Sequence, residues 1–270
     1  MKISNIVSRR NRILLRELVI TDFKLRYQGS ALGYLWSLLK PLFLFTILYI
    51  VFGMFLRLGG DIPHFPVYLL LGIVLWSFFT EATAQGLSAI VDRGDLIRKI
   101  NFPKYIIIVA GTTSALINLL LNLLVVFFFI WINGVELTWS ALFLPLVIIE
   151  LYIFALALAF FLSAFYVKFR DINYLWEVGI QGAFYATPIL YPLSLVMQQS
   201  ELAAKILMLN PMAQMIQDAR YLLITPQTVT VYELFQNYWY AYIPFIIVGF
   251  SVIAASIYFK KSSKSFAENV

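Results

Sequence analysis

Apolar runs of about 20 residues dominate this sequence, and an α-helix needs a run of that length to cross the hydrocarbon core of a membrane. Hydrophobic residues make up 61% of the chain and charged residues 13%, too few charges to cover the surface of a soluble protein. The 270 residues have room for six spans and their loops, and for no soluble catalytic domain. We therefore expect an all-α integral membrane protein, a single transmembrane domain over residues 1–270, with spans at residues 34–56, 67–91, 105–131, 140–167, 174–187 and 241–259.

The basic residues are distributed unevenly over the loops of this topology. All but three of the 20 Lys and Arg residues fall on one side, and the three on the other side are Arg57, Lys205 and Arg220. Because cytoplasmic loops carry an excess of Lys and Arg, the asymmetry predicts cytoplasmic termini and an even number of spans. The net charge of +6 then reflects residues that set topology and contact anionic membrane lipid, and no nucleic-acid partner is expected.

Residues 1–30 are expected to form a cytoplasmic interfacial helix before the first span. Apolar or aromatic residues recur every four positions, with polar residues on the opposite side: Leu15, Val19, Phe23 and Tyr27 against Glu17, Thr21, Lys24 and Gln28. This pattern is typical of an amphipathic helix in the headgroup region. Gly29 and Gly33 permit a bend after it, and the rings of Tyr34 and Trp36 suit a membrane interface.

The first inner loop, residues 92–104, is predicted to contain a short helix of its own. Asp95 can cap that helix and a following proline ends it, while Leu96, Ile97 and Ile100 form one apolar edge. An amphipathic turn detached from the spans needs something that buries this edge. A partner protein and the lipid surface are the two candidates.

Polar side chains inside the spans favour helix packing. An ionised Glu81 in the middle of its span would cost about 3 kcal/mol, so it should face the bundle interior, a subunit contact or a wet cavity. Its nearest partners in the sequence include Gln85. Asn118 and Asn122 lie four apart on one helix face, which favours hydrogen bonds between helices over ligand binding.

The region 188–224 is predicted to fold back within the outer leaflet as short re-entrant helices that form an outer gate. Pro188 and Pro192 remove backbone donors and disfavour helix at the residues before them, which argues against a straight span through this point. The neighbouring residues are too apolar to lie free in water, and non-helical backbone at that depth must be satisfied by protein or water. The alternative is a kinked fifth span, followed by a segment, 201–223, that lies flat on the outer surface.

The chemistry that is missing narrows the function classes. No glycine is followed by lysine, so the G-x-x-x-x-G-K-[ST] phosphate loop is absent and the chain cannot hydrolyse ATP by that mechanism. There is no cysteine and one histidine, His64, which excludes thiolate and multi-histidine metal sites. Neither Glu81 nor Glu150 has an evident catalytic partner, so no catalytic residue is expected. A membrane-embedded glycosyl- or acyltransferase and an ion-driven carrier remain as alternatives.

Four blocks of the sequence carry a family resemblance. They are the stretch RYQGSALGYLWSLLKP at 26–41, the loop block 93–103, the Arg170-Asp171-Ile172 triplet and the Asn210-Pro211 pair. With them the chain resembles, over nearly its whole length, the permease subunits of ABC-2 type polysaccharide exporters, a family that exports O-antigen, teichoic acid, capsule and cell-wall polysaccharides. Among these it is most similar to exporters of rhamnose-rich wall polysaccharides in Gram-positive bacteria.

The resemblance implies a function and a set of partners. It implies an ATP-driven exporter of lipid-linked polysaccharide in the bacterial cytoplasmic membrane, built from a homodimer of this chain and two ABC ATPase subunits. ATP and Mg²⁺ would be bound by those partner subunits, and this chain would hold no cofactor. An ABC-2 exporter of another substrate, such as a lipid or a drug, is the alternative within the family.

The resemblance and the patterns above together assign candidate roles. The coupling helix that contacts the ATPase is assigned to Arg93, Gly94, Asp95, Leu96, Ile97, Arg98, Lys99 and Ile100, and the cytoplasmic interface or gate to Arg26, Tyr27, Arg170 and Asp171. Aromatic faces can stack on sugar rings, so the channel lining is assigned to Tyr34, Trp36, Tyr49, Tyr185 and Tyr191. The outer gate is assigned to Pro188, Pro192, Asn210 and Pro211.

Overall fold

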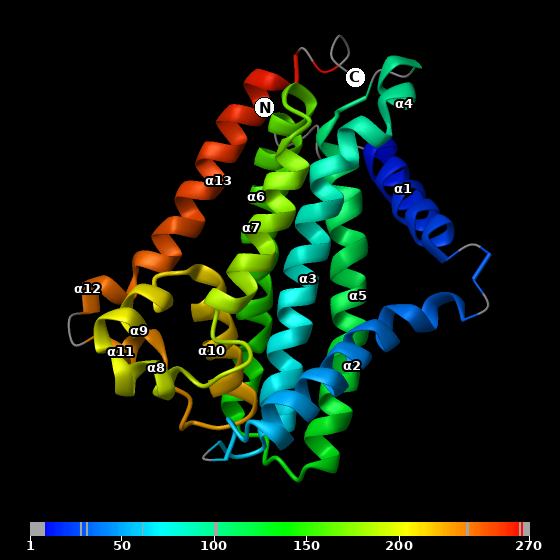
Figure 1. The fold of residues 1–270 in the computed structure, drawn as a ribbon. Coiled ribbons are helices and arrows are strands. Elements are labelled where there is room, and N and C mark those ends of the chain that lie inside the picture. The colour runs from blue at the N-terminus through cyan, green and yellow to red at the C-terminus, as the bar shows by residue number, and fades with distance from the viewer. Residues whose placement is uncertain are drawn as a thin grey trace.

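The protein is an elongated bundle of helices in a computed structural model that describes residues 9–27, 29–30, 32–60, 62–99, 102–235, 238–264 and 266. Within these ranges there is no β-strand. Helix α1 (Arg9–Tyr27) and the last turns of α13 (Ile243–Ser262) lie toward the same end of the bundle (Figure 1). The all-helical class predicted from the sequence is confirmed for the described residues.

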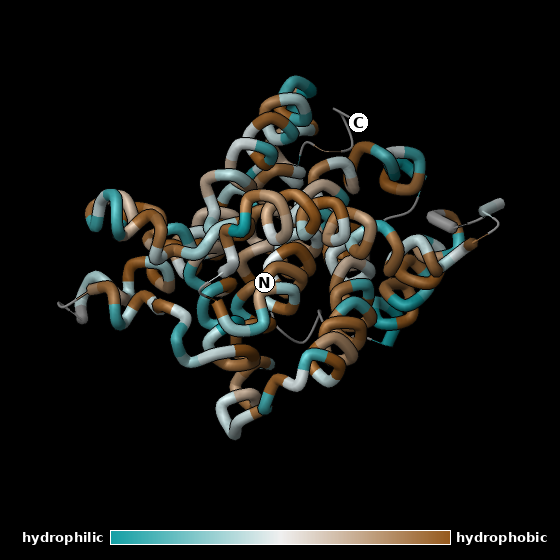
Figure 2. Tube along the Cα trace, turned by 60° about the horizontal axis from the view of Figure 1, so that its bottom comes forward, coloured by the Kyte–Doolittle hydropathy of each residue, from teal (hydrophilic) through white to brown (hydrophobic). Residues whose placement is uncertain are grey.

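Five helical segments are long and apolar enough to cross a membrane, which makes the chain a multi-pass membrane protein. They are Gly33–Phe55, made of η2 (Gly33–Leu35), α2 (Trp36–Leu48) and the π-helix η3 (Tyr49–Phe55); α3 (Phe65–Asp92); α5 (Tyr105–Ile132); Trp139–Lys168, made of η4 (Trp139–Phe143) and α6 (Leu144–Lys168); and Trp239–Ser262, which contains most of α12 (Tyr238–Ala241) and all of α13. Each agrees with a predicted span to within a few residues. Hydrophobic residues dominate these long helices in Figure 2, and hydrophilic ones gather at their ends and in the outlying helices.

The predicted fifth span corresponds to α7 (Ile172–Ala186), which is shorter than the others. Its 15 residues rise roughly 22 Å at the pitch of an α-helix, less than the hydrocarbon thickness of about 30 Å. The helix ends directly before Thr187 and Pro188, where the proline was expected to stop it. A total of six spans therefore stays a prediction.

Helix α3 is the centre of the bundle, packed most extensively against α5 and α6. In its most apolar window 78% of the residues are buried, against 11% for the first span, so the first span lies at the periphery. Close packing of α3 on α6 depends on small residues, because a Cβ atom added to Gly86 would lie 2.2 Å from the Cβ of Ala159. Ala155 and Ala159 are both fully buried.

The N-terminal helix α1 leads into the first span through a bend. Gly29 and Gly33 have φ angles of 77° and 48°, a left-handed backbone that only glycine adopts without strain. Helix α1 packs against α5, and its Asp22 forms an ion pair with Arg93 at the end of α3. A helix and a bend are thus present where the sequence predicted them, and the position of this helix at the membrane interface stays a prediction.

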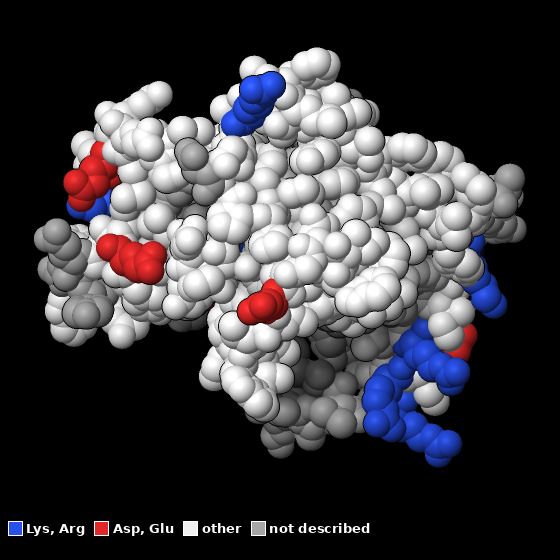
Figure 3. Space-filling view, turned by 90° about the horizontal axis from the view of Figure 1, so that it is seen from below, with Lys and Arg blue, Asp and Glu red and all other residues white. Residues whose placement is uncertain are grey.

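A group of short helices follows α7 and packs at the end of the bundle that lies away from α1 and α4. It comprises α8 (Leu193–Gln199), α9 (Glu201–Met208), α10 (Pro211–Leu223) and α11 (Val231–Leu234). Helix α10 contacts α3, α6 and α13, beside their ends that lie away from α1 and α4 (Figure 1). Viewed from that end, the surface is largely uncharged, with isolated acidic and basic patches and a group of Lys and Arg at one margin (Figure 3). These helices thus form a layer of short helices at that end of the bundle.

Candidate functional site

A cavity of about 840 Å³ opens in the side of the bundle, between the first span, α3, α5 and α7. Its volume is within the usual range for ligand sites. Aromatic side chains and polar side chains both line it. The aromatic residues are Trp36, Trp76, Phe78, Phe184 and Tyr185, and the polar ones are Ser37, Lys40, Ser77, Thr80, Glu81, Gln85, Asn118, Asn122 and Gln181.

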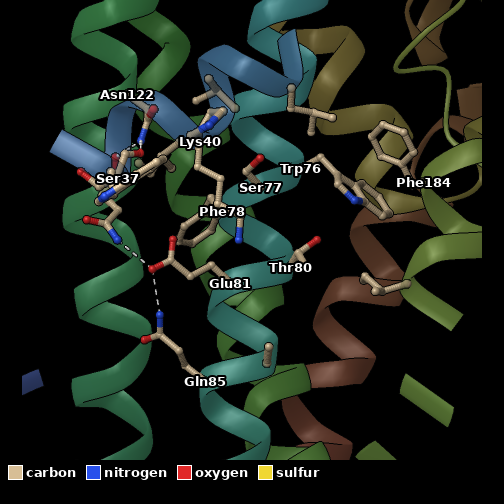
Figure 4. Close-up of a pocket in the computed structure, with 18 of the residues that line it drawn as sticks. Ser37, Lys40, Trp76, Ser77, Phe78, Thr80, Glu81, Gln85, Asn122 and Phe184 are labelled. Carbon is tan, nitrogen blue, oxygen red and sulfur yellow. Dashed lines mark hydrogen bonds between the residues drawn. The ribbon is translucent and has the colours of Figure 1, made fainter. Parts of the chain in front are cut away.

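The polar side of the cavity is organised around Glu81. Its Oε1 accepts hydrogen bonds from Asn118 Nδ2 at 2.7 Å and from Gln85 Nε2 at 2.8 Å (Figure 4). Asn122 Nδ2 donates to the backbone oxygens of Ser37 at 3.1 Å and of Asn118 at 2.8 Å. The expected hydrogen bonds between helices are confirmed, because Asn118 links α5 to α3 and Asn122 links α5 to α2. We call Glu81, Gln85, Asn118 and Asn122 the Glu81 shelf.

The aromatic side of the cavity comes from three helices. The rings of Trp76 on α3 and Phe184 on α7 meet edge to face, with their centroids 5.9 Å apart. In Figure 4 they lie across the cavity from Ser37 and Asn122. A carboxylate, amides and aromatic rings facing one space can hydrogen-bond hydroxyl groups and pack against apolar ring faces.

Two of the five aromatic residues predicted as lining, Trp36 and Tyr185, line this cavity. The other three lie elsewhere among the described residues. Tyr34 is near Phe23, Tyr49 stacks on Phe45, and Tyr191 donates a hydrogen bond to the backbone oxygen of Tyr185. The lining role of all five stays a prediction.

The break after α7 is held by a residue to which the sequence analysis gave no role, Arg220 of α10. Its side chain is fully buried. Nη1 donates to the backbone oxygen of Pro188 at 2.6 Å and Nη2 to that of Ile189 at 2.8 Å. Nε donates to the backbone oxygen of Tyr68 at 3.1 Å, and the guanidinium carbon lies 3.5 Å from the centre of the Tyr68 ring. One arginine therefore joins α3, the break and α10.

The contacts of Arg220 offset two energetic costs, that of backbone carbonyls without a partner and that of a buried cation. Backbone carbonyls without a helical partner are costly in a membrane protein, and the guanidinium supplies donors to those of Pro188 and Ile189. A buried cation is costly as well, and here carbonyl oxygens, Gln217 Oε1 at 2.9 Å and an aromatic face surround it. Gly72 leaves the space for this, since a Cβ there would lie 2.6 Å from Arg220 Nη2.

The four residues predicted for the outer gate gather around the same break. Pro188 and Pro192 are buried in the turn between α7 and α8. Asn210 caps α10, with its Oδ1 accepting from the backbone N–H of Met212 at 3.0 Å, and Pro211 occupies the first turn. Asn210 Nδ2 lies 3.4 Å from Thr187 Oγ1, which connects the cap to the end of α7. Their gating role stays a prediction.

The predicted coupling loop forms α4 (Gly94–Lys99) and is partly covered by the chain itself. Ile97 is 7% exposed and belongs to an apolar cluster that contains Phe102 and Phe266, and Leu96 packs against that cluster. Ile100 lies outside the described residues. The side chains that α4 leaves exposed are those of Asp95, Arg98 and Lys99. Any surface this helix offers to a partner is therefore mainly charged.

The C-terminal segment is attached to the same inner cluster. Lys104 Nζ donates to the backbone oxygen of Ser263 at 2.7 Å and lies 5.5 Å from the centre of the Phe266 ring. Burial lowers the pKa of Lys104 below its usual value. These contacts fix the end of α13 against the start of α5.

The predicted cytoplasmic gate residues are only partly described. The side chains of Arg26 and Tyr27 lie outside the described part of the structure, although their backbone belongs to α1. Arg170 and Asp171 are exposed in the turn between α6 and α7, and Arg170 lies over the ring of Tyr166, 5.2 Å from its centre. No ion pair joins Arg170 to Asp171 among the described contacts. Their role stays a prediction.

The match to known proteins covers most of the chain: the model of the ABC-2 type transporter family aligns with residues 13–224. This chain belongs to the ABC-2 type transporter family. The O-antigen export system permease protein RfbA of Myxococcus xanthus is 34% identical over 204 residues, 76% of this chain and 77% of that protein. A Klebsiella pneumoniae protein of the same description is 30% identical over 248 residues, 92% of this chain and 91% of that protein.

Membership of the ABC-2 family decides between the function classes. A permease of this family is the membrane subunit of a transporter and is not itself a catalytic enzyme. The transferase and ion-driven carrier interpretations are therefore dropped. The family generally works with a separate ABC ATPase, in agreement with the absence of a phosphate-binding loop from this ABC-2 permease.

Proposed function

We propose that this permease is the membrane subunit of an ATP-driven exporter that moves lipid-linked polysaccharide across the bacterial cytoplasmic membrane. The observation that carries the proposal is the cavity, where rings such as Trp76 and Phe184 face the Glu81 shelf. Aromatic faces suit the apolar faces of sugar rings, and amides and a carboxylate suit their hydroxyl groups. The curated relatives are named as O-antigen export permeases, which supports a polysaccharide over a drug or a lipid alone.

The cavity is completed, in this proposal, by a second copy of the chain. Helix α7 buries only Ile180, while apolar Val178 and polar Glu177 and Gln181 are exposed. A carboxylate that faces lipid at the level of a span is costly, so this face needs protein or water beside it. The α7 helix of a second copy covers the apolar residues of this face. Together the two copies close the open side of the cavity and enclose a water-filled channel.

The helix group after α7 is proposed to form the outer gate. Helix α7 is the fifth of six spans and reaches only part of the way across, and the segment 188–224 fills the outer leaflet as re-entrant helices. The buried Arg220 supports this, because it satisfies carbonyls at a depth where water is scarce. With an even number of spans, both termini lie in the cytoplasm together with the interfacial helix of residues 1–30.

Cross-linking tests the dimer. Because the chain has no cysteine, Val178→Cys places one thiol on the exposed face of α7, at a residue that is 71% exposed. We expect a disulfide-linked dimer in native membranes after oxidation. The matched control is Phe250→Cys on α13, 70% exposed, which should stay monomeric. Only monomer from Val178→Cys would refute the dimer.

Deletion of the gene tests the export function. It should remove polymer from the cell surface and leave it inside the cell.

Charge reversal tests the coupling loop, which is proposed to contact two ATPase subunits that bind ATP and Mg²⁺. Replacing exposed Arg98 and Lys99 with glutamate should lower export at least about tenfold, through loss of complementary charge at the contact, without loss of permease from the membrane. The ATPase should no longer copurify. The control is the same double charge reversal at Lys260 and Lys261, which are exposed at the end of α13. It should leave both export and copurification of the ATPase unchanged.

A substitution at the buried Ile97 separates an effect on folding from an effect on the ATPase contact. Ile97→Asp places a charge in the inner apolar cluster and should deplete the permease itself, so it reports on folding and not on coupling. Normal export and normal ATPase copurification after the Arg98 and Lys99 reversal would show that α4 is not the contact.

A further inference from the structure

Glu81 is a carboxylate in the middle of α3 that faces a cavity. Placing an ionisable side chain inside a membrane helix costs free energy, so such a residue is rarely present without a function. One that faces a wet cavity and has hydrogen-bond partners there is a candidate for a functional site. Here Gln85 and Asn118 fix its Oε1 through two amide donors. Trp76 lies on the same helix, and Phe184 extends the aromatic side from α7.

The charged group of the Glu81 shelf is a carboxylate, which accepts hydrogen bonds and donates none. Gln85 and Asn118 each donate an amide N–H to its Oε1, and Asn122 donates to the backbone oxygens of Ser37 and Asn118. A ligand that hydrogen-bonds to the carboxylate must therefore bring donors.

The charged groups of the cavity wall further restrict the class of ligand. A uronate or phosphate group brings acceptors and negative charge toward a fixed carboxylate, and both are unfavourable. Lys40 is the one basic residue among the described residues that line the cavity, so its wall has no excess of positive charge that would attract a polyanion. Neutral hydroxyl groups bring donors without charge.

We propose that the Glu81 shelf is a binding step for uncharged, hydroxyl-bearing sugar units, which place their hydroxyl edge on the shelf and an apolar ring face against Trp76 and Phe184. The proposal rests on the proposed export function and adds the substrate class to it. Units that carry carboxylate or phosphate groups are bound more weakly at this step.

The first experiment measures occupancy in cells. Ser77 lines the cavity beside the shelf, and Ser77→Cys gives the chain a single thiol there. N-Ethylmaleimide, which enters cells and modifies thiols exposed to water, should label it more slowly while polymer is being made. Adding Glu81→Gln should remove this protection and lower export about tenfold, because a charge-assisted acceptor is replaced by an amide that carries its own donors.

The second experiment tests the substrate class. In membrane vesicles that contain the complete transporter, maltohexaose should slow the labelling of Ser77→Cys, whereas hexagalacturonate at the same concentration should not. Glu136→Gln is the matched control for Glu81→Gln, because Glu136 is exposed in the turn between α5 and η4, away from the cavity. It should change neither export nor labelling.

The outcomes separate the shelf from the export function. Unchanged export and unchanged protection with Glu81→Gln, no protection by maltohexaose, or equal protection by both oligosaccharides would each overturn the shelf while leaving the exporter intact. Normal surface polymer in a strain that lacks this gene would instead refute the export function itself. Membrane levels of the Glu81→Gln permease equal to wild type confirm that the variant folds.

Discussion

Replacement of Arg220 with methionine is expected to destabilise the permease by about 3–5 kcal/mol, and most of the protein should be lost from the membrane. Methionine fills part of the volume but leaves the backbone oxygens of Tyr68, Pro188 and Ile189 without their donors. Each buried acceptor that loses its partner costs about 1–3 kcal/mol. Permease level in membranes and the midpoint of thermal unfolding in detergent are the measurements.

The matched control for this substitution is Arg57→Met, in the exposed turn between η3 and α3. It removes an arginine from the same end of the molecule and should leave both measurements near wild type. Arg220→Lys should recover only part of the loss, because one ammonium cannot reproduce the planar fork that reaches three carbonyls. If Arg220→Met unfolds at the wild-type temperature, the guanidinium does not hold the break together.

The role of Arg220 could not be inferred from the sequence, although its neighbourhood could. The prolines at 188 and 192 predicted where α7 ends, because their effect on the backbone is local. The three backbone oxygens that accept from Arg220 lie 31, 32 and 152 positions away. Only tertiary packing brings them together, so an arginine counted as an outer charge is in fact buried.

The loop of residues 92–104 shows the same limit of sequence-based prediction, here for the apolar edge of α4. The spacing of Leu96, Ile97 and Ile100 predicted that one edge of α4 must be covered, and Ile97 is covered. Periodicity identifies a face but not the partner that buries it. Here the cover includes Phe266, which lies about 170 residues further along the chain and carries no periodic signal of its own.

The cavity was the least predictable part of the site. The apolar composition that identifies a span also hides which side of it faces a channel, because most residues of α3 are apolar on every face. Polar residues were the better guide: Glu81, Asn118 and Asn122 were singled out from the sequence and are lining residues. Trp76 and Phe184 were missed, since only the arrangement of α3 and α7 places them opposite that shelf.

Replacement of Gly86 with leucine is expected to separate α3 from α6 and to cost about 3 kcal/mol of folding free energy. A Cβ atom alone would lie 2.2 Å from the Cβ of Ala159 and 2.9 Å from its Cα, and backbone cannot move aside as a flexible side chain can. The matched control is Gly249→Leu on α13, where a Cβ meets nothing within 4 Å. It should unfold at or slightly above the wild-type temperature, because leucine has the higher helix propensity.

A pair of smaller substitutions isolates the contact itself. Gly86→Ala should destabilise by about 1–3 kcal/mol, and Ala159→Gly in the same chain should return much of that loss, since it removes the methyl group that the new one meets. Ala159→Gly alone should also destabilise, because it leaves a small void and adds a glycine to α6. The two losses therefore should not add. Additive losses in thermal unfolding would mean that the helices relax apart without cost, and that α3 is not held on α6 by this contact.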